Sequence, residues 1–464
     1  MISENSLFSS FNLDTESAKP SRQTLKSFDF ADDSNTPFAL WKDKPVSRAQ
    51  LYSHVETLSR RLPDGKYAIN LCEDKYLFAV SFLAVLVRHQ TNLLPPNQTS
   101  AVITELIGKY PSSYIISDQV ESGLPVSPFI VDTLRAGIEF PHPPSIESEH
   151  LAVCAFTSGS TGNPKPNPRT WGQLKSAALL AIDRFNLTTD PQLVVSTVPT
   201  QHMYGLETSF LWPLFSSSFL HSSQPFFPED IRQLIKSTPQ PCMLISTPPH
   251  LKACVRSQLE WQNVAGILSA TAPMSMALAK QVEYSFKAPL FEIFGSTETF
   301  SFASRKPARE TFWQPYEKTR VVSSQDASYL EVEHFDDIKR LDDRLEIQKN
   351  GTFSVQGRSA DLVKVAGKRM SLAALNQHLQ QINGVEDGLY FVPENQTESS
   401  HLGALVVSRL DKSVILHQLK QLIDQVFLPR PLYHVREIPR NTLGKVNQQD
   451  LGHFLKGLSG DQNP

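Results

Sequence analysis

Short apolar runs recur between Tyr67 and Phe294, and helix-like stretches separate them, as in proteins whose strands and helices alternate. The runs that predict strands are Tyr67–Leu71, Tyr114–Ser117, Leu151–Phe156, Leu193–Val198, Met243–Ser246, Gly266–Ser269 and Leu290–Phe294. Several of them lead directly into loops rich in Ser, Thr, Gly and Pro. Because open α/β sheets bind ligands at the carboxyl ends of their strands, we expect the functional site at these loops.

The pattern changes after Tyr329, where shorter segments with turn signals follow. The dipeptide Asn350-Gly351 lies between Leu345–Lys349 and Thr352–Gln356, which predicts a β-hairpin with a type I′ turn. Further along, we expect a helix opened by Ser371 and a strand near 405–407.

The C-terminal part continues with a predicted helix around 413–426 and a polar tail from about Pro439. We therefore predict an α/β fold with two domains. The first is a large N-terminal α/β domain with sub-domains, residues 1–356, and the second is a small mobile C-terminal α+β domain, residues 357–464.

Composition restricts the partners and the compartment. With 44 Lys and Arg against 47 Asp and Glu, the net charge is −3, which argues against nucleic acid or an anionic membrane as the main partner. The longest apolar stretch, Tyr76–Val87, has 12 residues and is too short to span a bilayer. The N-terminus has no signal-peptide pattern, and the four cysteines form no CxxC pair, so we expect a cytoplasmic protein.

The segment from Phe156 to Lys165 reads Phe-Thr-Ser-Gly-Ser-Thr-Gly-Asn-Pro-Lys and is the most informative in the chain. Its glycines let the backbone approach an anion, its hydroxyls add hydrogen-bond donors, and Lys165 adds positive charge. These are the parts of a triphosphate-binding loop, although the spacing is not that of a Walker A loop. The alternative is a solvated turn after a strand.

Two further segments carry groups suited to a nucleotide. In the segment Phe291–Thr299, Phe294 would stack on a base and Glu298 would bind Mg²⁺ among phosphates, the alternative being a core Phe and a surface Glu. Asp343 would accept both ribose hydroxyls with help from Arg358, although a charged domain linker is the commoner explanation of such a stretch. A fourth segment, Pro439–Lys445, would by itself pass as an exposed tail.

These four segments, in this order, resemble the ANL superfamily of adenylate-forming enzymes, which contains acyl-CoA synthetases, peptide-synthetase adenylation domains and luciferases. The resemblance runs from Pro45 to Leu451 and is to the stand-alone acyl-CoA or acyl-carrier-protein synthetase type. Thr200–Gly205 is similar to the His-containing segment beside the acyl pocket, and Ser269–Pro273 to the segment along the adenine.

The resemblance implies a role for each matching residue toward ATP. The β- and γ-phosphates would be bound by Thr157, Ser158, Gly159, Ser160, Thr161, Gly162 and Lys165. Adenine would lie against Ala270, Thr271, Ala272, Phe294 and Gly295. Thr297 would contact the α-phosphate, Glu298 would bind Mg²⁺, and Asp343 with Arg358 would hold the ribose.

The resemblance also implies how the acid would react. Lys445 would bridge the attacking carboxylate and the α-phosphate, where negative charge develops in the transition state. Lys364 and Gly367 would face the site only after the small domain rotates for thioester formation. The acyl pocket would be lined by His202, Tyr204, Gly205 and Phe300.

Several residues depart from the family pattern. Phe294 replaces a Tyr, Ala360 or the adjacent Asp361 occupies the hinge, and Asn447 replaces a common Arg. Phe300 would either shorten the acyl pocket or pack in the core. The phosphate loop continues as Pro166-Asn167-Pro168-Arg169-Thr170-Trp171 where Gly-Val and Ser-His are common.

The sequence thus predicts an ATP- and Mg²⁺-dependent ligase that activates a fatty or aryl acid as an acyl-adenylate. Because only 19 residues follow Lys445, we expect the thiol acceptor in trans, either CoA or the phosphopantetheine of a separate carrier protein. One alternative is an amino-acid adenylation enzyme that loads a carrier protein, which Glu207 keeps open. Another is a non-catalytic nucleotide-binding protein of the same fold, against which Lys165, Glu298 and Lys445 argue.

Overall fold

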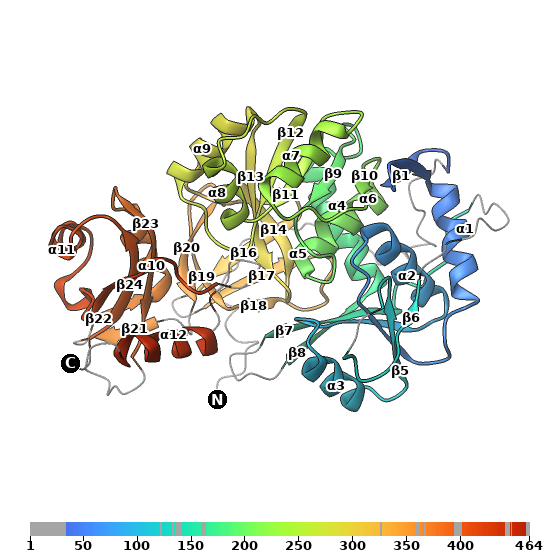
Figure 1. Ribbon diagram of the computed structural model, residues 1–464, viewed down its shortest axis with the longest axis horizontal. Helices are drawn as coiled ribbons and strands as arrows, with labels where there is room; N and C mark the ends of the chain where they lie inside the picture. The colour runs from blue at the N-terminus through green and yellow to red at the C-terminus, as the bar shows by residue number, and fades with distance from the viewer. Residues whose placement is uncertain are drawn as a thin grey trace, which may run out of the picture.

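A six-stranded sheet occupies one end of the large lobe (Figure 1), with the strand order β6-β5-β3-β4-β7-β8. Its strands are β3 (Tyr67–Asn70), β4 (Thr91–Leu94), β5 (Ser113–Ser117), β6 (Phe129–Ile130), β7 (Leu151–Ser158) and β8 (Pro164–Thr170). The pairs among the first five strands are parallel, and only the β7–β8 pair is antiparallel. The β7–β8 hairpin therefore ends the sheet, with the predicted phosphate-binding loop at its turn.

The computed structural model describes residues 34–120, 123–131, 134, 142–158, 164–324, 327–358, 362–365, 368–393, 401–440, 446 and 448–460. Within these, a second sheet has the order β15-β14-β13-β12-β11-β9-β10-β1-β2. Its strands are β1 (Pro37–Trp41), β2 (Lys44–Ser47), β9 (Leu193–Ser196), β10 (Phe219–His221), β11 (Cys242–Ser246), β12 (Val264–Ser269), β13 (Leu290–Ser296), β14 (Phe300–Arg305) and β15 (Gln314–Pro315). The central pairs are parallel, whereas β2, β14 and β15 are antiparallel to their neighbours. The seven strands predicted between Tyr67 and Phe294 are confirmed as β3, β5, β7, β9, β11, β12 and β13.

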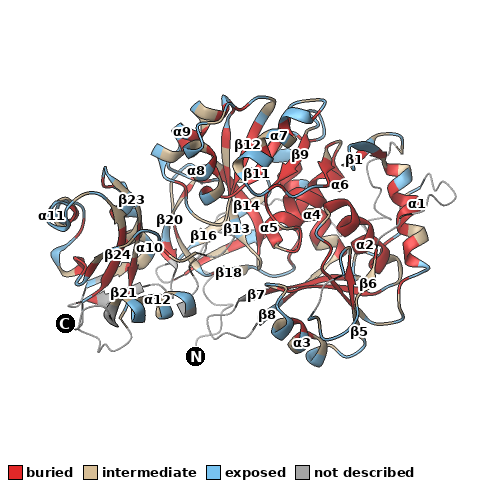
Figure 2. Ribbon diagram, viewed as in Figure 1, coloured by how far each residue is buried: buried red, intermediate tan, exposed pale blue. Residues whose placement is uncertain are grey.

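Helices pack on both sheets. They are α1 (Arg48–Ser59), α2 (Lys75–Val87), α3 (Ser100–Lys109), α4 (Trp171–Phe185), α5 (Met203–Leu206), the π-helix η2 (Glu207–Leu211), α6 (Trp212–Phe215), α7 (Pro228–Ser237), α8 (Pro248–Arg256) and α9 (Met276–Phe286). The long apolar run forms α2, which is buried along nearly its whole length (Figure 2). Among the described residues, no helix is both long and apolar enough to cross a membrane.

Two small antiparallel sheets follow β15. The first joins β16 (Thr319–Ser323), β17 (Ser328–Val332) and β18 (Lys339–Leu341), and the second is the hairpin of β19 (Asp343–Ile347) and β20 (Phe353–Arg358). The predicted hairpin is confirmed, but the predicted type I′ turn is wrong. Such a turn needs positive φ at both central residues, whereas here only Gly351 has it, at +82°. Gln348 pairs with Thr352, so the loop is one residue longer and ends in the left-handed glycine.

The C-terminal lobe has its own core, and Figure 1 shows it beside the large lobe. Its elements are β21 (Leu362–Val365), β22 (Lys368–Ser371), α10 (Leu372–Gln381), β23 (Val385–Phe391), β24 (Gly403–Ser408), α11 (Lys412–Leu422), the 3₁₀ helix η4 (Gln425–Phe427), β25 (Leu432–His434) and α12 (Gln448–Gly460). Ser371 caps α10 as predicted, with Oγ accepting a hydrogen bond from the N–H of Ala374 at 3.1 Å. The division at residue 356 remains a prediction.

The expectation of a polar tail after Pro439 is wrong for its last part, which forms α12. The residues Leu451, Phe454, Leu455 and Leu458 recur at helical spacing and pack on the cluster around Phe391 and Leu405. This spacing was the available sequence signal. The polar residues between them concealed it.

Candidate active site

The β7–β8 hairpin brings a lysine to the start of the predicted phosphate loop. Thr157 and Lys165 are directly paired across the hairpin, and the Lys165 side chain is exposed. Its amino group makes no hydrogen bond or ion pair with any described residue, so its charge is available to a ligand. Asn167 braces the hairpin, because its amide nitrogen donates to the carbonyl oxygen of Lys165 at 3.1 Å. The residues Gly159, Ser160, Thr161 and Gly162 lie outside the described part of the chain.

A short loop between β13 and β14 carries Thr297 and Glu298 at its tip. Ser296 and Thr299 close it: the N–H of Ser296 donates to Thr299 Oγ1 at 3.0 Å, and that of Glu298 to Ser296 Oγ at 3.2 Å. Gly295 is required by this closure, since a Cβ there would lie 1.9 Å from the carbonyl oxygen of Phe300. The loop is thus tightly defined by its own side chains.

The donor set at this loop fits a magnesium ion that is bound with a nucleotide. The half-buried Glu298 carboxylate has no hydrogen-bond or ion-pair partner among the described residues. No group of three or more His, Cys, Asp or Glu suited to a metal occurs in that same part of the chain. Mg²⁺ commonly takes one or two carboxylates and completes its shell with phosphate oxygens and water. The Glu298 carboxylate, which interacts electrostatically with Arg169, is a donor of the kind that this requirement names.

Phe294 lies on β13 and is half-buried. Its ring packs on Phe302, Trp313 and Phe353, with centroid distances of 5.4, 5.2 and 5.7 Å. The neighbouring strand β12 ends at Ser269, so the half-buried Ala270, Thr271 and Ala272 reach the same edge of the sheet. The Phe294 ring is therefore packed against other aromatic rings and partly accessible, and its stacking on a base stays a prediction.

A buried ion pair supports this aromatic group. Glu292 accepts hydrogen bonds from Arg305 Nε at 2.8 Å and from the backbone N–H of Met274 at 2.8 Å. The Arg305 guanidinium also lies over the Trp313 ring, 4.5 Å from its centroid. Burial raises the pKa of the Glu292 carboxyl, and the nearby Arg305 partly opposes that shift. Sequence analysis missed this pair, because Glu292 and Arg305 meet only through the β13–β14 pairing.

The predicted ribose pair is brought together by the hairpin. Asp343 and Arg358 are directly opposite each other in the β19–β20 ladder. Lys364 lies on β21, whereas Gly367 and Lys445 fall outside the described residues.

The predicted acyl segment forms the start of α5. His202 caps this helix, with Nδ1 accepting from the N–H of Tyr204 at 3.3 Å. The buried Tyr204 hydroxyl hydrogen-bonds to the carbonyl oxygens of Ser246 at 3.1 Å and Leu268 at 3.0 Å. A Cβ at Gly205 would lie 2.0 Å from the Pro199 carbonyl oxygen. Tyr204 thus fixes the segment against β11 and β12, and Gly205 allows the close approach to Pro199.

Phe300 packs in the core, the second of the two alternatives expected for it, and does not shorten an acyl pocket. It is 1% exposed and packs beside His334 and Phe335, so it offers no surface to an acyl chain. Its φ of +60° is unusual for a residue with a large side chain.

Glu207 is buried in η2, and both of its oxygens are engaged. One accepts the backbone N–H of Ser301 at 3.1 Å, and the other accepts the Ser301 hydroxyl. Burial raises the pKa of the Glu207 carboxyl to about 7. The amino-acid alternative, which Glu207 keeps open in the sequence, therefore gains no support from this side chain, because both of its oxygens bond to Ser301.

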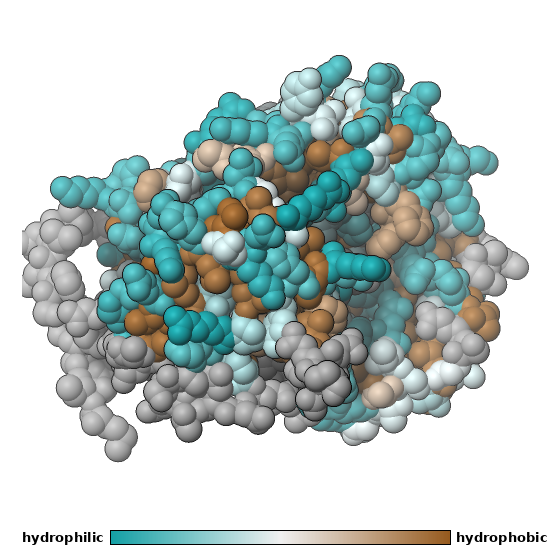
Figure 3. All heavy atoms as spheres, turned by 60° about the vertical axis from the view of Figure 1, so that its left-hand side comes forward, coloured by the Kyte–Doolittle hydropathy of each residue, from teal (hydrophilic) through white to brown (hydrophobic). Residues whose placement is uncertain are grey.

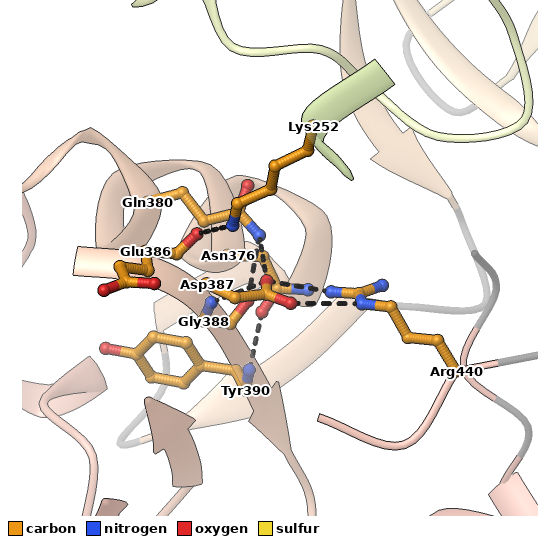
Figure 4. A network of polar contacts seen from close by, with 8 residues as sticks. All are labelled: Lys252, Asn376, Gln380, Glu386, Asp387, Gly388, Tyr390 and Arg440. Atoms are coloured by element: carbon orange, nitrogen blue, oxygen red, sulfur yellow. Dashed lines mark hydrogen bonds and ion pairs between the residues drawn. The ribbon is translucent and has the colours of Figure 1, made fainter. Parts of the chain in front are cut away.

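The two lobes meet through a polar network between α8 and the start of β23 (Figure 4). Lys252 Nζ donates to the Glu386 carbonyl oxygen at 2.5 Å, and Arg256 forms an ion pair with the Glu386 carboxylate. The next residue, Asp387, binds Arg440 through Nε at 3.2 Å and Nη2 at 3.0 Å.

On the face shown in Figure 3, hydrophobic residues occur in groups among hydrophilic ones.

Comparison with known proteins gives a family match and several relatives. The model of the family described as AMP-binding enzyme matches residues 57–332. A 4-coumarate–CoA ligase of Rhodobacter capsulatus is 28% identical over 240 residues, which is 52% of this chain and 60% of that protein. A 3,4-dihydroxybenzoate–[aryl-carrier protein] ligase of Bacillus anthracis is 19% identical over 313 residues, covering 66% of this chain and 74% of that protein.

The fold has solved counterparts. The crystal structure of ATP-bound MatB from Rhodopseudomonas palustris superposes with a TM-score of 0.79 at 18% identity, over 92% of this chain and 97% of that one. The fold predicted from the sequence is confirmed by this likeness.

Proposed function

The chain belongs to the AMP-binding enzyme family, within the ANL superfamily of adenylate-forming enzymes, and we propose that it activates a carboxylic acid with ATP and passes the acyl group to a thiol. One observation carries the proposal. Arg169, on the strand that follows the phosphate loop, donates hydrogen bonds to the carbonyl oxygens of Thr297 and Glu298. The contact joins segments 128 and 129 residues apart, so the hairpin that carries Lys165 lies against the loop that carries Glu298.

Each residue has a defined task in this reaction. Lys165 places a positive charge at the triphosphate, and Glu298 would hold Mg²⁺. When bound, the metal would neutralise phosphate charge and favour the departure of pyrophosphate. Phe294 would offer a ring face to adenine, Asp343 and Arg358 would hold the ribose, and Thr297 would contact the α-phosphate.

Lys445 acts on the acid. A carboxylate is a weak nucleophile and is repelled by a triphosphate, so a cation between the two stabilises the transition state. Lys364 and Gly367 would serve the second step, in which a thiol attacks the mixed anhydride. We place these three residues in a small C-terminal domain, residues 357–464, which excludes water while the anhydride is present.

An aryl or fatty acid is favoured over an amino acid. Two relatives are by name ligases of 4-coumarate and of 3,4-dihydroxybenzoate, both aryl acids. Glu207, the acidic residue that follows the acyl segment in the sequence, is buried and held by Ser301. The same two relatives use CoA and an aryl-carrier protein respectively, and either thiol fits the proposal.

The proposal is tested by pyrophosphate release from Mg-ATP with a panel of aryl, fatty and amino acids, with and without CoA. We expect turnover with one acid class, and a loss of at least about 100-fold in Lys445→Ala, because a charge that acts in the transition state is removed. Formation of ADP instead of AMP would contradict adenylation. No pyrophosphate release with any acid of the panel, while ATP still binds, would favour a nucleotide-binding protein without catalysis.

A further inference from the structure

Arg169 is the point at which the phosphate-loop hairpin touches the loop of Thr297 and Glu298. It lies on β8, and its guanidinium Nη2 donates to the carbonyl oxygen of Thr297 at 3.0 Å and to that of Glu298 at 2.7 Å. It thereby binds the carbonyl group of the peptide bond that precedes Glu298 and that of the peptide bond that follows it.

The guanidinium is also held from the side. It lies over the rings of Phe300 and Phe335, at 5.6 and 5.5 Å from their centroids. Phe300 is the first residue of β14, so the same arginine contacts the loop and the strand that follows it. A cation over two aromatic rings with paired N–H groups keeps one orientation.

This arrangement has a cost that ordinary packing would avoid. A largely buried cation loses hydration, and Arg169 Nε has no hydrogen-bond partner among the described residues. Phe300 has a backbone φ of +60° where Arg169 packs on it. Backbone strain of this kind persists only where the surrounding structure enforces it, and it is concentrated at functional sites.

We propose that Arg169 is a positioning residue that fixes the Thr297–Glu298 backbone and so directs the Glu298 carboxylate toward the divalent cation of a bound nucleotide. The inference rests on the proposed function, in which Glu298 is the metal ligand. It assigns a role to a residue outside the motifs that identified the phosphate loop and the metal loop. It also explains why the hairpin places a cation beside a loop that already closes on itself through Ser296 and Thr299.

The consequence is a link between Arg169 and the effect of Mg²⁺ on nucleotide affinity. If Arg169 directs the Glu298 carboxylate, its loss weakens metal binding and leaves the direct contacts to the nucleotide unchanged. A merely structural arginine would alter affinity equally with and without the metal.

The test is calorimetric binding of α,β-methylene-ATP, which cannot release pyrophosphate, in Mg²⁺ and in EDTA. We expect the wild-type chain to bind more tightly with Mg²⁺. Arg169→Gln should lose roughly tenfold of that gain, the size expected for hydrogen bonds from a charged group, with less than about a threefold change in EDTA. An unchanged gain in the variant, or no gain in the wild type, would overturn the inference.

Two further variants keep the result interpretable. Arg184→Gln removes another partly buried hydrogen bond from an arginine to β14, from Nε to Ser304 Oγ at 2.7 Å. This variant should leave the gain in nucleotide affinity with Mg²⁺ unchanged. If Arg169→Gln does not fold, as judged by circular dichroism, Arg169→Lys replaces it. A lysine keeps the charge but has no planar fork for two carbonyl groups, so at least about a threefold loss of the gain is expected. A full gain in that variant would count against the inference.

The outcome is separable from that of the proposed function. Binding with the expected Mg²⁺ pattern but no pyrophosphate release with any acid would refute the proposed reaction and leave the role of Arg169 standing. Pyrophosphate release by the wild type together with an unchanged Mg²⁺ gain in Arg169→Gln would refute the role of Arg169 alone.

Discussion

The carboxylate of Glu207 accepts the backbone N–H of Ser301 at 3.1 Å, across 94 residues of sequence. Through this bond η2, which follows the predicted acyl segment, is joined to β14, which follows the predicted metal loop. Tyr316 extends the network, because its hydroxyl donates to Ser301 Oγ at 3.1 Å. A buried acid thus connects two parts of the candidate site.

Glu207 gives the stability of the protein a specific pH dependence. Its pKa is raised to about 7 in the folded chain by burial, above the ordinary 4.5. The unfolded chain therefore loses this proton at lower pH, so the stability contributed by protonated Glu207 is fully present below about pH 4.5 and is lost as the pH rises to about 7. Glu207→Gln should remove about 3 kcal/mol of that dependence.

The measurement is the thermal midpoint of wild type and Glu207→Gln from pH 5 to pH 8. The difference between the two should change in favour of the variant as the pH rises to about 7 and level off above it. Glu331→Gln, at an exposed ion pair with Arg320, is the control and should follow the wild type. Parallel curves for wild type and Glu207→Gln would show that Glu207 does not titrate in this range.

Gly205 should tolerate no side chain. Its Cβ would lie 2.0 Å from the backbone oxygen of Pro199, which cannot move without shifting the acyl segment. We expect Gly205→Ala to destabilise the protein by about 1–3 kcal/mol, as overpacking of a core does.

A matched glycine gives the opposite sign. Gly108 lies in α3 with no atom within 4 Å of the position of a Cβ, so Gly108→Ala should stabilise by roughly 0.5–1 kcal/mol. The measurement is the denaturation midpoint of Gly205→Ala and of Gly108→Ala, each compared with that of the wild type. Equal midpoints would refute the steric argument.

Removing Glu292 should affect both stability and nucleotide binding. Its loss leaves Arg305 largely buried without its partner, which typically costs about 3–5 kcal/mol. Because Arg305 lies over Trp313, on which Phe294 packs, Glu292→Ala should also weaken ATP binding.

The exposed pair of Glu331 with Arg320, at 3.6 Å, is again the comparison. Glu331→Ala should cost less than about 1 kcal/mol and leave ATP affinity unchanged. Chemical unfolding and calorimetry measure both effects. A Glu292→Ala protein that is as stable as Glu331→Ala would show that the buried pair contributes no net stability.

The contact between the lobes should restrain their orientation more than it stabilises the fold. The ion pair of Arg256 and Glu386 is exposed, so the double variant Lys252→Gln, Arg256→Gln should lose less than about 1 kcal/mol. Its distribution of distances between the lobes should nevertheless broaden.

All four cysteines are buried, so cysteines introduced at the exposed Tyr284 and Leu422 can carry spin labels selectively. The measurement is the distance distribution between those labels. Arg232→Gln, which removes an exposed pair within α7, serves as the control. A distribution equal to that of the control would exclude a restraining role for the contacts of Lys252 and Arg256 with Glu386, of which Figure 4 shows that of Lys252.

The sequence by itself determined what depends on neighbours in the chain. Apolar runs of strand length and the helix cap at Ser371 could be predicted because local sterics and hydrogen bonding fix them, whereas the loop after Ser158 lies outside the described residues. The type I′ turn and the polar tail were misjudged because a one-residue change in a loop, or a buried face on a short helix, depends on the partner that packs there.

Tertiary structure alone decided which distant groups meet. Arg169 with Glu298, Glu207 with Ser301 and Glu292 with Arg305 are joined by sheet register and helix packing, and none of these pairs shares a local pattern. The physical reason is that hydrogen bonds between distant residues depend on the register of whole strands, which the burial of apolar faces selects for the chain as a unit.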